Sequence, residues 1–138
     1  MRIILRSVFL AASLLSGPGL TWAAIGVNAD HGAVWQTTKI GETTQGFLEI
    51  HNNGTASDVL TGWDCPVAGA TTLVDGAGKA LTSLTIQPGQ SVTLSANGPH
   101  LVLQSTHFTV DYGSLVPCSL TFRDAGDVGV YLNAVPAP

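Results

Sequence analysis

Turn-forming residues interrupt most of this sequence at short intervals. Asn52-Asn53-Gly54, Pro88-Gly89 and Asp124-Ala125-Gly126 are three of these interruptions. The stretches between them are short and rich in Val, Leu, Thr and Phe, which are residues that favour strands. We predict strands at residues 33–37, 46–51, 57–65, 70–74, 82–86, 91–95, 100–105, 116–123 and 128–133. Short strands at this spacing are typical of an all-β sandwich or barrel, and no window has the period of a long amphipathic helix.

The first 23 residues have the pattern of a secretory signal peptide. Arg2 and Arg6 form a positive region, and an apolar run from Val8 to Leu15 follows it. The run is too short to span a bilayer, so we expect no stable membrane insertion. Cleavage after Ala23 would leave one mature domain of residues 24–138, whereas a retained N-terminal anchor is the alternative.

Charge and composition exclude several classes of partner and activity. The mature part would hold three basic side chains (Lys39, Lys79 and Arg123) and nine carboxylates, a formal charge of 3 − 9 = −6. It therefore lacks the basic patch that a nucleic-acid-binding surface needs. Apolar residues make up 45% and charged residues 10% of the chain, which excludes intrinsic disorder. Because no nucleophile elbow and no catalytic carboxylate pair is visible, we expect no enzyme.

The two cysteines, Cys65 and Cys118, both belong to the mature part. An even number of cysteines in an exported chain predicts a disulfide. Two buried free thiols or a Cys-Cys-His copper site are the alternatives. Strand alternation places each cysteine on the more apolar face of its strand. These faces are Val59, Thr61, Trp63 and Cys65 in one strand, and Val116, Cys118, Leu120 and Phe122 in the other.

Several segments follow one another in an order that is known from a protein family. They are Phe47-Leu48-Glu49-Ile50-His51-Asn52-Asn53-Gly54, Asp58-Val59-Leu60-Thr61-Gly62, Pro66-Val67-Ala68-Gly69, Ile86-Gln87-Pro88-Gly89 and Gly98-Pro99-His100-Leu101-Val102-Leu103. In this order and spacing the chain resembles the PCuAC family of periplasmic copper chaperones. The resemblance covers nearly all of the mature part. It implies a single cupredoxin-like (Greek-key) β-sandwich, a periplasmic monomer and a role in copper delivery to cytochrome oxidase through its assembly proteins.

The copper ligands of that family are two His and two Met, a donor set that suits Cu(I). The resemblance places the first His at Val74 and its companion Met at Gly76, and a further Met near Gly78. It places the family's His-x-Met pair at His100 and Val102. Only His100 keeps a family ligand, and the chain's one methionine is its first residue. Because Leu101 is expected to point inward, alternation places His100 on the surface side of its strand.

Other imidazoles offer a substitute for the missing ligands. A site built from His100, His107 and His31 would favour Cu(II) or Zn(II) over Cu(I). We expect His31 to lie beside Asp30 on an arm near the new amino terminus, and His51 to form local hydrogen bonds. Two functions follow: a copper-handling protein with a rebuilt or weakened site, or a metal-free binding or assembly module on the same fold. An enzyme that uses the cysteines or histidines is the third hypothesis, and the missing catalytic motifs count against it.

Overall fold

The computed structural model describes residues 26–138. The predicted signal peptide, residues 1–23, lies outside this range. Within the described residues no helix is long and apolar enough to cross a membrane.

The described chain forms strands and no helix. The strands are β1 (Val27–Trp35), β2 (Thr44–Asn52), β3 (Asp58–Asp64), β4 (Ala68–Val74), β5 (Leu84–Ile86), β6 (Ser91–Leu94), β7 (His100–Thr106), β8 (Leu115–Phe122) and β9 (Gly126–Val135). Each overlaps one predicted run, which confirms the all-β prediction. The largest difference is in β1, which begins six residues before the predicted start at residue 33. His31 therefore lies within a strand, and its placement on an arm was wrong.

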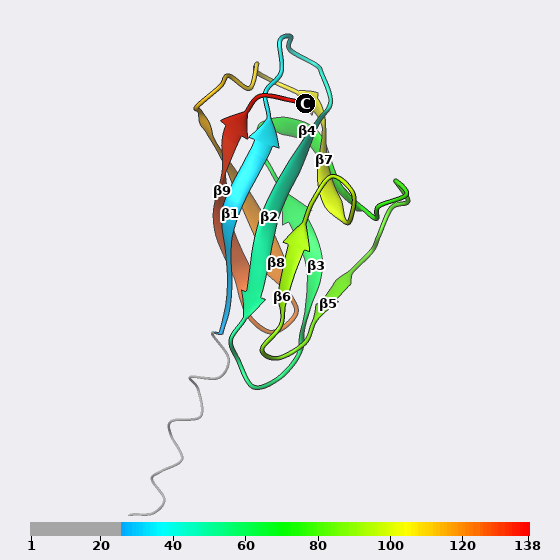
Figure 1. Cartoon of the computed structure of the whole chain (residues 1–138), viewed down its shortest axis with the longest axis vertical. Helices are drawn as coiled ribbons and strands as arrows, with labels where there is room; N and C mark the ends of the chain where they lie inside the picture. Colours follow the sequence, from blue (N-terminus) through cyan, green and yellow to red (C-terminus); the bar gives the residue numbers. More distant parts are fainter. Residues whose placement is uncertain (1–25) are drawn as a thin grey trace, which may run out of the picture.

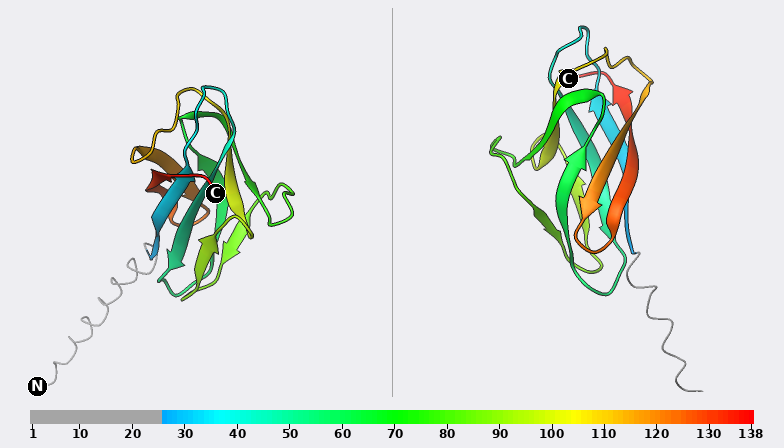
Figure 2. Two further views of the ribbon diagram at one scale, coloured as in Figure 1. Left: turned by 45° about the horizontal axis from the view of Figure 1, so that its top comes forward. Right: turned by 180° about the vertical axis from the view of Figure 1, so that it is seen from behind.

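The strands follow one continuous path that curls over itself. Their order is β4-β7-β2-β1-β9-β8-β3-β5, and β6 pairs with β2 beyond the end of β7. The parallel pair β1–β9 joins the two halves of the path. Figures 1 and 2 show β1, β2 and β6 in one layer, with β8 and β3 behind them. This arrangement is the cupredoxin-like β-sandwich that the resemblance implies.

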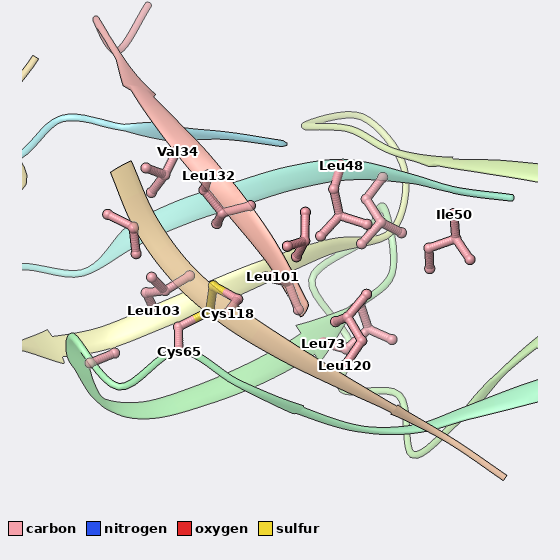
Figure 3. Packing of buried hydrophobic residues seen from close by; sticks show 14 of the residues in the cluster. Val34, Leu48, Ile50, Cys65, Leu73, Leu101, Leu103, Cys118, Leu120 and Leu132 are labelled. Atoms are coloured by element: carbon pink, nitrogen blue, oxygen red, sulfur yellow. A yellow bond between two sulfur atoms is a disulfide. The ribbon is translucent and has the colours of Figure 1, made fainter. Parts of the chain in front are cut away.

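The core lies between the two layers and is almost entirely aliphatic. Leu48 and Ile50 of β2, Leu101 of β7, and Leu120 and Leu132 of the opposite layer are all at most 1% exposed. Figure 3 shows these side chains meeting across the interior. Burial alternates residue by residue along β2. Glu49, between Leu48 and Ile50, and His51, after Ile50, therefore face outward, as the pleat of a strand requires.

A disulfide joins Cys65 to Cys118 and confirms the predicted pairing. It connects the residue after β3 to the neighbouring strand β8, and both sulfurs lie in the core (Figure 3). The two alternatives, buried free thiols and a Cys-Cys-His copper site, are therefore wrong.

One face assignment in β3 also fails. Val59 and Thr61 were expected to share the inward face of Cys65, but the buried residues at this end of the strand are Asp58 and Leu60. The cause is a register shift between Leu60 and Gly62 in the pairing with β8. A bulge of this kind inserts one residue and exchanges the two faces of the strand beyond it.

Candidate metal-binding site

The outer face of β2 brings acidic and imidazole side chains together with those of β1. Glu49 and His51 are two residues apart on β2, so their side chains leave the same face. Asp30 of β1 is the direct cross-strand partner of Glu49. Figure 1 shows β1, β2 and β6 side by side in this layer. The pairing therefore places two carboxylates and an imidazole on one patch of the surface.

A bulge in β1 adds a second imidazole. The register of the β1–β2 pair shifts between Asp30 and Ala33, and His31 has a φ of 52°. This left-handed backbone conformation is uncommon for a residue with a side chain. Gly32 follows at a point where a Cβ atom would overlap the backbone oxygen of Tyr131 in β9. Regular alternation would turn His31 away from Asp30, whereas the bulge returns it to the same face.

Four side chains, Asp30, His31, Glu49 and His51, form what we call the acid–histidine cluster. Oδ1 of Asp30 lies 2.7 Å from Nε2 of His51 and 2.8 Å from Nδ1 of His31. Oε1 of Glu49 lies 3.7 Å and 3.8 Å from the same two nitrogens. One potential ligand atom from each side chain lies within 4.8 Å of all the others.

His51 is the anchored member of the cluster. Its side chain is 22% exposed, compared with 70% for His31. A carboxylate oxygen can only accept, so Nε2 of His51 donates to Asp30, and Nδ1 of the neutral ring accepts from the Ser91 hydroxyl at 2.8 Å. Ser91 comes from β6, where it is the cross-strand partner of His51. His51 was expected to form local hydrogen bonds near the turn that follows β2, but its partners lie on the neighbouring strands β1 and β6.

The hydrogen bonds of the cluster favour a negatively charged Asp30 and a positively charged His31. Hydrogen bonds from His31 and then from His51 lower the pKa of Asp30 below its usual value. The hydrogen bond to Asp30 raises the pKa of His31, and the charges of Asp30 and Glu49 add to this effect. Both shifts show that the patch attracts positive charge.

The donor set fits a divalent transition metal. Bonds from Zn²⁺ to His nitrogen and carboxylate oxygen are about 2.0–2.2 Å long, so neighbouring ligand atoms on one ion lie about 3–4 Å apart. The nitrogen–oxygen separations in the cluster run from 2.7 to 3.8 Å, so small side-chain adjustments suffice. Two imidazole nitrogens and two carboxylate oxygens suit Cu(II) or Zn(II).

The other sequence-predicted ligands lie elsewhere. His100 begins β7 opposite Val74 of β4, which is the register expected if the two positions face one site. However, His100 is only 6% exposed, so the prediction of a surface imidazole was wrong. Phe47 lies against its ring, with centroids 6.1 Å apart, and Nδ1 donates to the Gly98 carbonyl at 2.9 Å.

His107 is exposed just after β7. Among residues 26–138, the group of three or more candidate ligands that converge is the acid–histidine cluster, which includes His31 but neither His100 nor His107. Asp30 and Glu49 were not among the predicted ligands, and His51 was interpreted as a hydrogen-bonding residue. The Glu49-x-His51 spacing on a predicted strand was a usable signal.

Comparisons with known proteins agree with this fold. The family model of the LpqE-like lipoproteins matches residues 27–134. The apo PCuAC domain from PmoF1 superposes with a TM-score of 0.73 at 21% identity, covering 81% of this chain and 95% of that one. The copper-bound PCuAC domain from PmoF2 gives 0.71 at 20%, covering 82% and 94%. The Cu(I) form of DR1885 from Deinococcus radiodurans gives 0.60 at 22%, covering 77% of each chain. No curated protein matches the sequence significantly.

Proposed function

Because this chain belongs to the LpqE-like family and has the fold of PCuAC domains, we propose that it is an exported copper-handling protein that binds copper at the acid–histidine cluster. The observation that carries this proposal is the convergence of four nitrogen and oxygen donors within 4.8 Å. Copper is a cargo in this proposal, and the role is binding rather than catalysis. The copper-bound state of one PCuAC domain of the same fold supports the choice of ion.

The positions that the PCuAC resemblance assigns to the copper ligands support a relocated site. Val74 and Val102 have no donor atoms, and Val74 lies opposite His100. The Nδ1 atom of His100 already donates to the Gly98 carbonyl, which leaves Nε2 of His100 as the one free nitrogen donor among Val74, His100 and Val102. One donor does not hold an ion tightly, because a metal site needs several converging ligands. The acid–histidine cluster offers four.

Each member of the cluster has a distinct place in the proposed site. Asp30 is central, because its Oδ1 meets both imidazoles. When an ion replaces the proton on Nε2 of His51, the ring carries its proton on Nδ1 and can donate to the Ser91 hydroxyl. Ser91 is thus a positioning residue, because its hydroxyl can donate to the His51 ring in the metal-free protein and accept from it in the copper-bound protein. His31 is the most exposed member and borders the solvent side, where the ion would enter and leave.

We also propose that the protein works in the periplasm and delivers copper to a partner protein. Residues 1–23 have the pattern of a signal peptide, and a disulfide is typical of an oxidising compartment such as the periplasm. Neither cysteine is free to carry a lipid, although the family is described as lipoproteins. The PCuAC resemblance supports delivery towards cytochrome oxidase assembly proteins.

Copper titration by equilibrium dialysis tests the proposed site. We expect one ion per chain for the wild type and binding that is at least about 100-fold weaker, a change of about 2.7 kcal/mol, for the Asp30→Asn/His51→Gln double variant. The matched control is His107→Gln, which removes an exposed imidazole outside the cluster and should leave affinity unchanged. Thermal unfolding of each variant shows that the fold is intact.

Three outcomes of the titration would count against the proposal. Unchanged affinity in the double variant would exclude the cluster. Loss of binding in His100→Gln alone would return the site to the position of the PCuAC ligands. Absence of saturable binding tighter than about 1 μM, or about −8 kcal/mol, would favour a metal-free binding module instead.

A further inference from the structure

We infer that the acid–histidine cluster holds copper as Cu(II) and does not retain Cu(I), so that reduction of the bound ion releases it. This inference rests on the proposed function and specifies the oxidation state of its cargo. It follows from the kind of donor atoms, the charge of the site and the absence of reachable sulfur within the described residues.

The donor atoms favour the oxidised ion. All four are imidazole nitrogen or carboxylate oxygen, the ligand types that suit Cu(II). Cu(I) prefers soft sulfur ligands, as in thioether or thiolate. Residues 26–138 contain no methionine, and the sulfurs of Cys65 and Cys118 are bonded to each other in the core. No sulfur of this part of the chain can therefore move into the cluster to stabilise Cu(I).

The charge of the site also matches a dication. Asp30 and Glu49 together carry two negative charges, and with neutral imidazoles they balance Cu²⁺. Among the described residues, the basic side chains paired with these two carboxylates are His31 and His51. No lysine or arginine in this part of the chain therefore competes with the ion for them. After reduction, the same ligands would hold Cu⁺ with one unbalanced negative charge and no soft donor. Cu(II) also binds nitrogen and oxygen sites more tightly than Zn(II) does.

Release requires one electron from outside the protein. A small one-electron reductant of the ascorbate class donates it to the bound ion, which passes from Cu(II) to Cu(I) while the reductant is oxidised. No residue changes its oxidation state, and the Cys65–Cys118 disulfide is not involved. With His31 70% exposed, the reduced ion is open to an acceptor that offers thioether or thiolate ligands.

Electron paramagnetic resonance of the Cu(II)-loaded protein gives the first readout. We expect hyperfine coupling to two nitrogens in the wild type. His31→Gln and His51→Gln should each remove one nitrogen from the spectrum, and the His107→Gln control should leave it unchanged. These spectra locate the ion independently of its affinity.

Anaerobic titration gives the second readout. Bicinchoninate, a chelator of Cu(I), competes with the protein after ascorbate is added. We expect the copper to pass to the chelator, with an apparent Cu(I) affinity at least about 100-fold below that for Cu(II). The chelator without ascorbate is the control for spontaneous loss.

The outcomes separate this inference from the proposed function. If Cu(I) remains bound with comparable affinity, and His51→Gln removes it, the cluster is a copper site but its proposed preference for Cu(II) is overturned. If neither oxidation state responds to the cluster variants, the proposed function fails as well. Two-nitrogen Cu(II) spectra together with release on reduction support both.

Discussion

Removing the Cys65–Cys118 disulfide should cost this domain much of its stability. The bridge closes a loop with a sequence separation of 53 residues. The chain-entropy relation for a loop of this length gives a stabilisation of about 4 kcal/mol at 25 °C. Since small domains are stable by only about 5–15 kcal/mol, this single bond accounts for a large share.

The same figure predicts the shift in melting temperature. The described domain has 138 − 25 = 113 residues. At about 2.1 cal/mol/K per residue, its unfolding entropy is about 0.24 kcal/mol/K, so a loss of 4 kcal/mol lowers Tm by about 17 °C. The variant to compare is Cys65→Ala/Cys118→Ala, because serine would place two unpaired hydroxyl groups at positions that are 0% and 5% exposed.

Urea unfolding and calorimetry on the oxidised wild type and the double alanine variant measure both quantities. The reduced wild type is the control, since it lacks the cross-link but keeps both sulfur atoms in the core. A free-energy loss below about 1 kcal/mol, with the wild type shown to hold no free thiol, would refute the loop-entropy reasoning. Two thiols titrating in the denatured, unreduced wild type would refute the disulfide itself.

Two other acidic side chains give further predictions. The buried carboxylate of Asp58 accepts hydrogen bonds from the backbone N–H groups of Asp124 and Ala125. Asp58→Ala should therefore cost about 2–4 kcal/mol in urea unfolding, and a cost near zero would contradict this role. Backbone hydrogen bonds, first from Thr38, lower the pKa of Glu42, so its contribution to stability is present above the unfolded pKa and is lost as pH falls through the folded value. An NMR titration of Glu42 should give a midpoint below that of an ordinary glutamate, and a midpoint at or above it would contradict the role of these hydrogen bonds.

The positions of the strands could be read from the sequence because turn residues mark their ends. The start of β1 could not, since residues 27–32 read Val-Asn-Ala-Asp-His-Gly. Apolar and polar residues alternate over the first four only, and Asn, Asp and Gly are depleted in strands. These residues become a strand through pairing with β2 on one side, and the strand continues along β9 on the other. Tertiary pairing of this kind overrides local propensity.

The cluster was harder to predict than the fold for a related reason. Asp30 and Glu49 meet only because of the β1–β2 register, which a sequence without its turn geometry does not specify. His31 joins them through a bulge, and simple alternation would have placed it on the other face. Glu49 and His51 were visible as a same-face pair, but two residues do not identify a metal site.

The alternation of β2 explains how a metal site could change its place while the fold is kept. Leu48 and Ile50 fill the core, so substitutions there would leave cavities that cost several kcal/mol. Glu49 follows Leu48 and His51 follows Ile50, and both lie on the outer face, where side chains can change with little effect on packing. The β4–β7 end is different, because His100 is already enclosed there beside Phe47 and a new ligand would have to displace packed side chains. The outer face of β1 and β2 is therefore the less costly place for this fold to gain a new metal site.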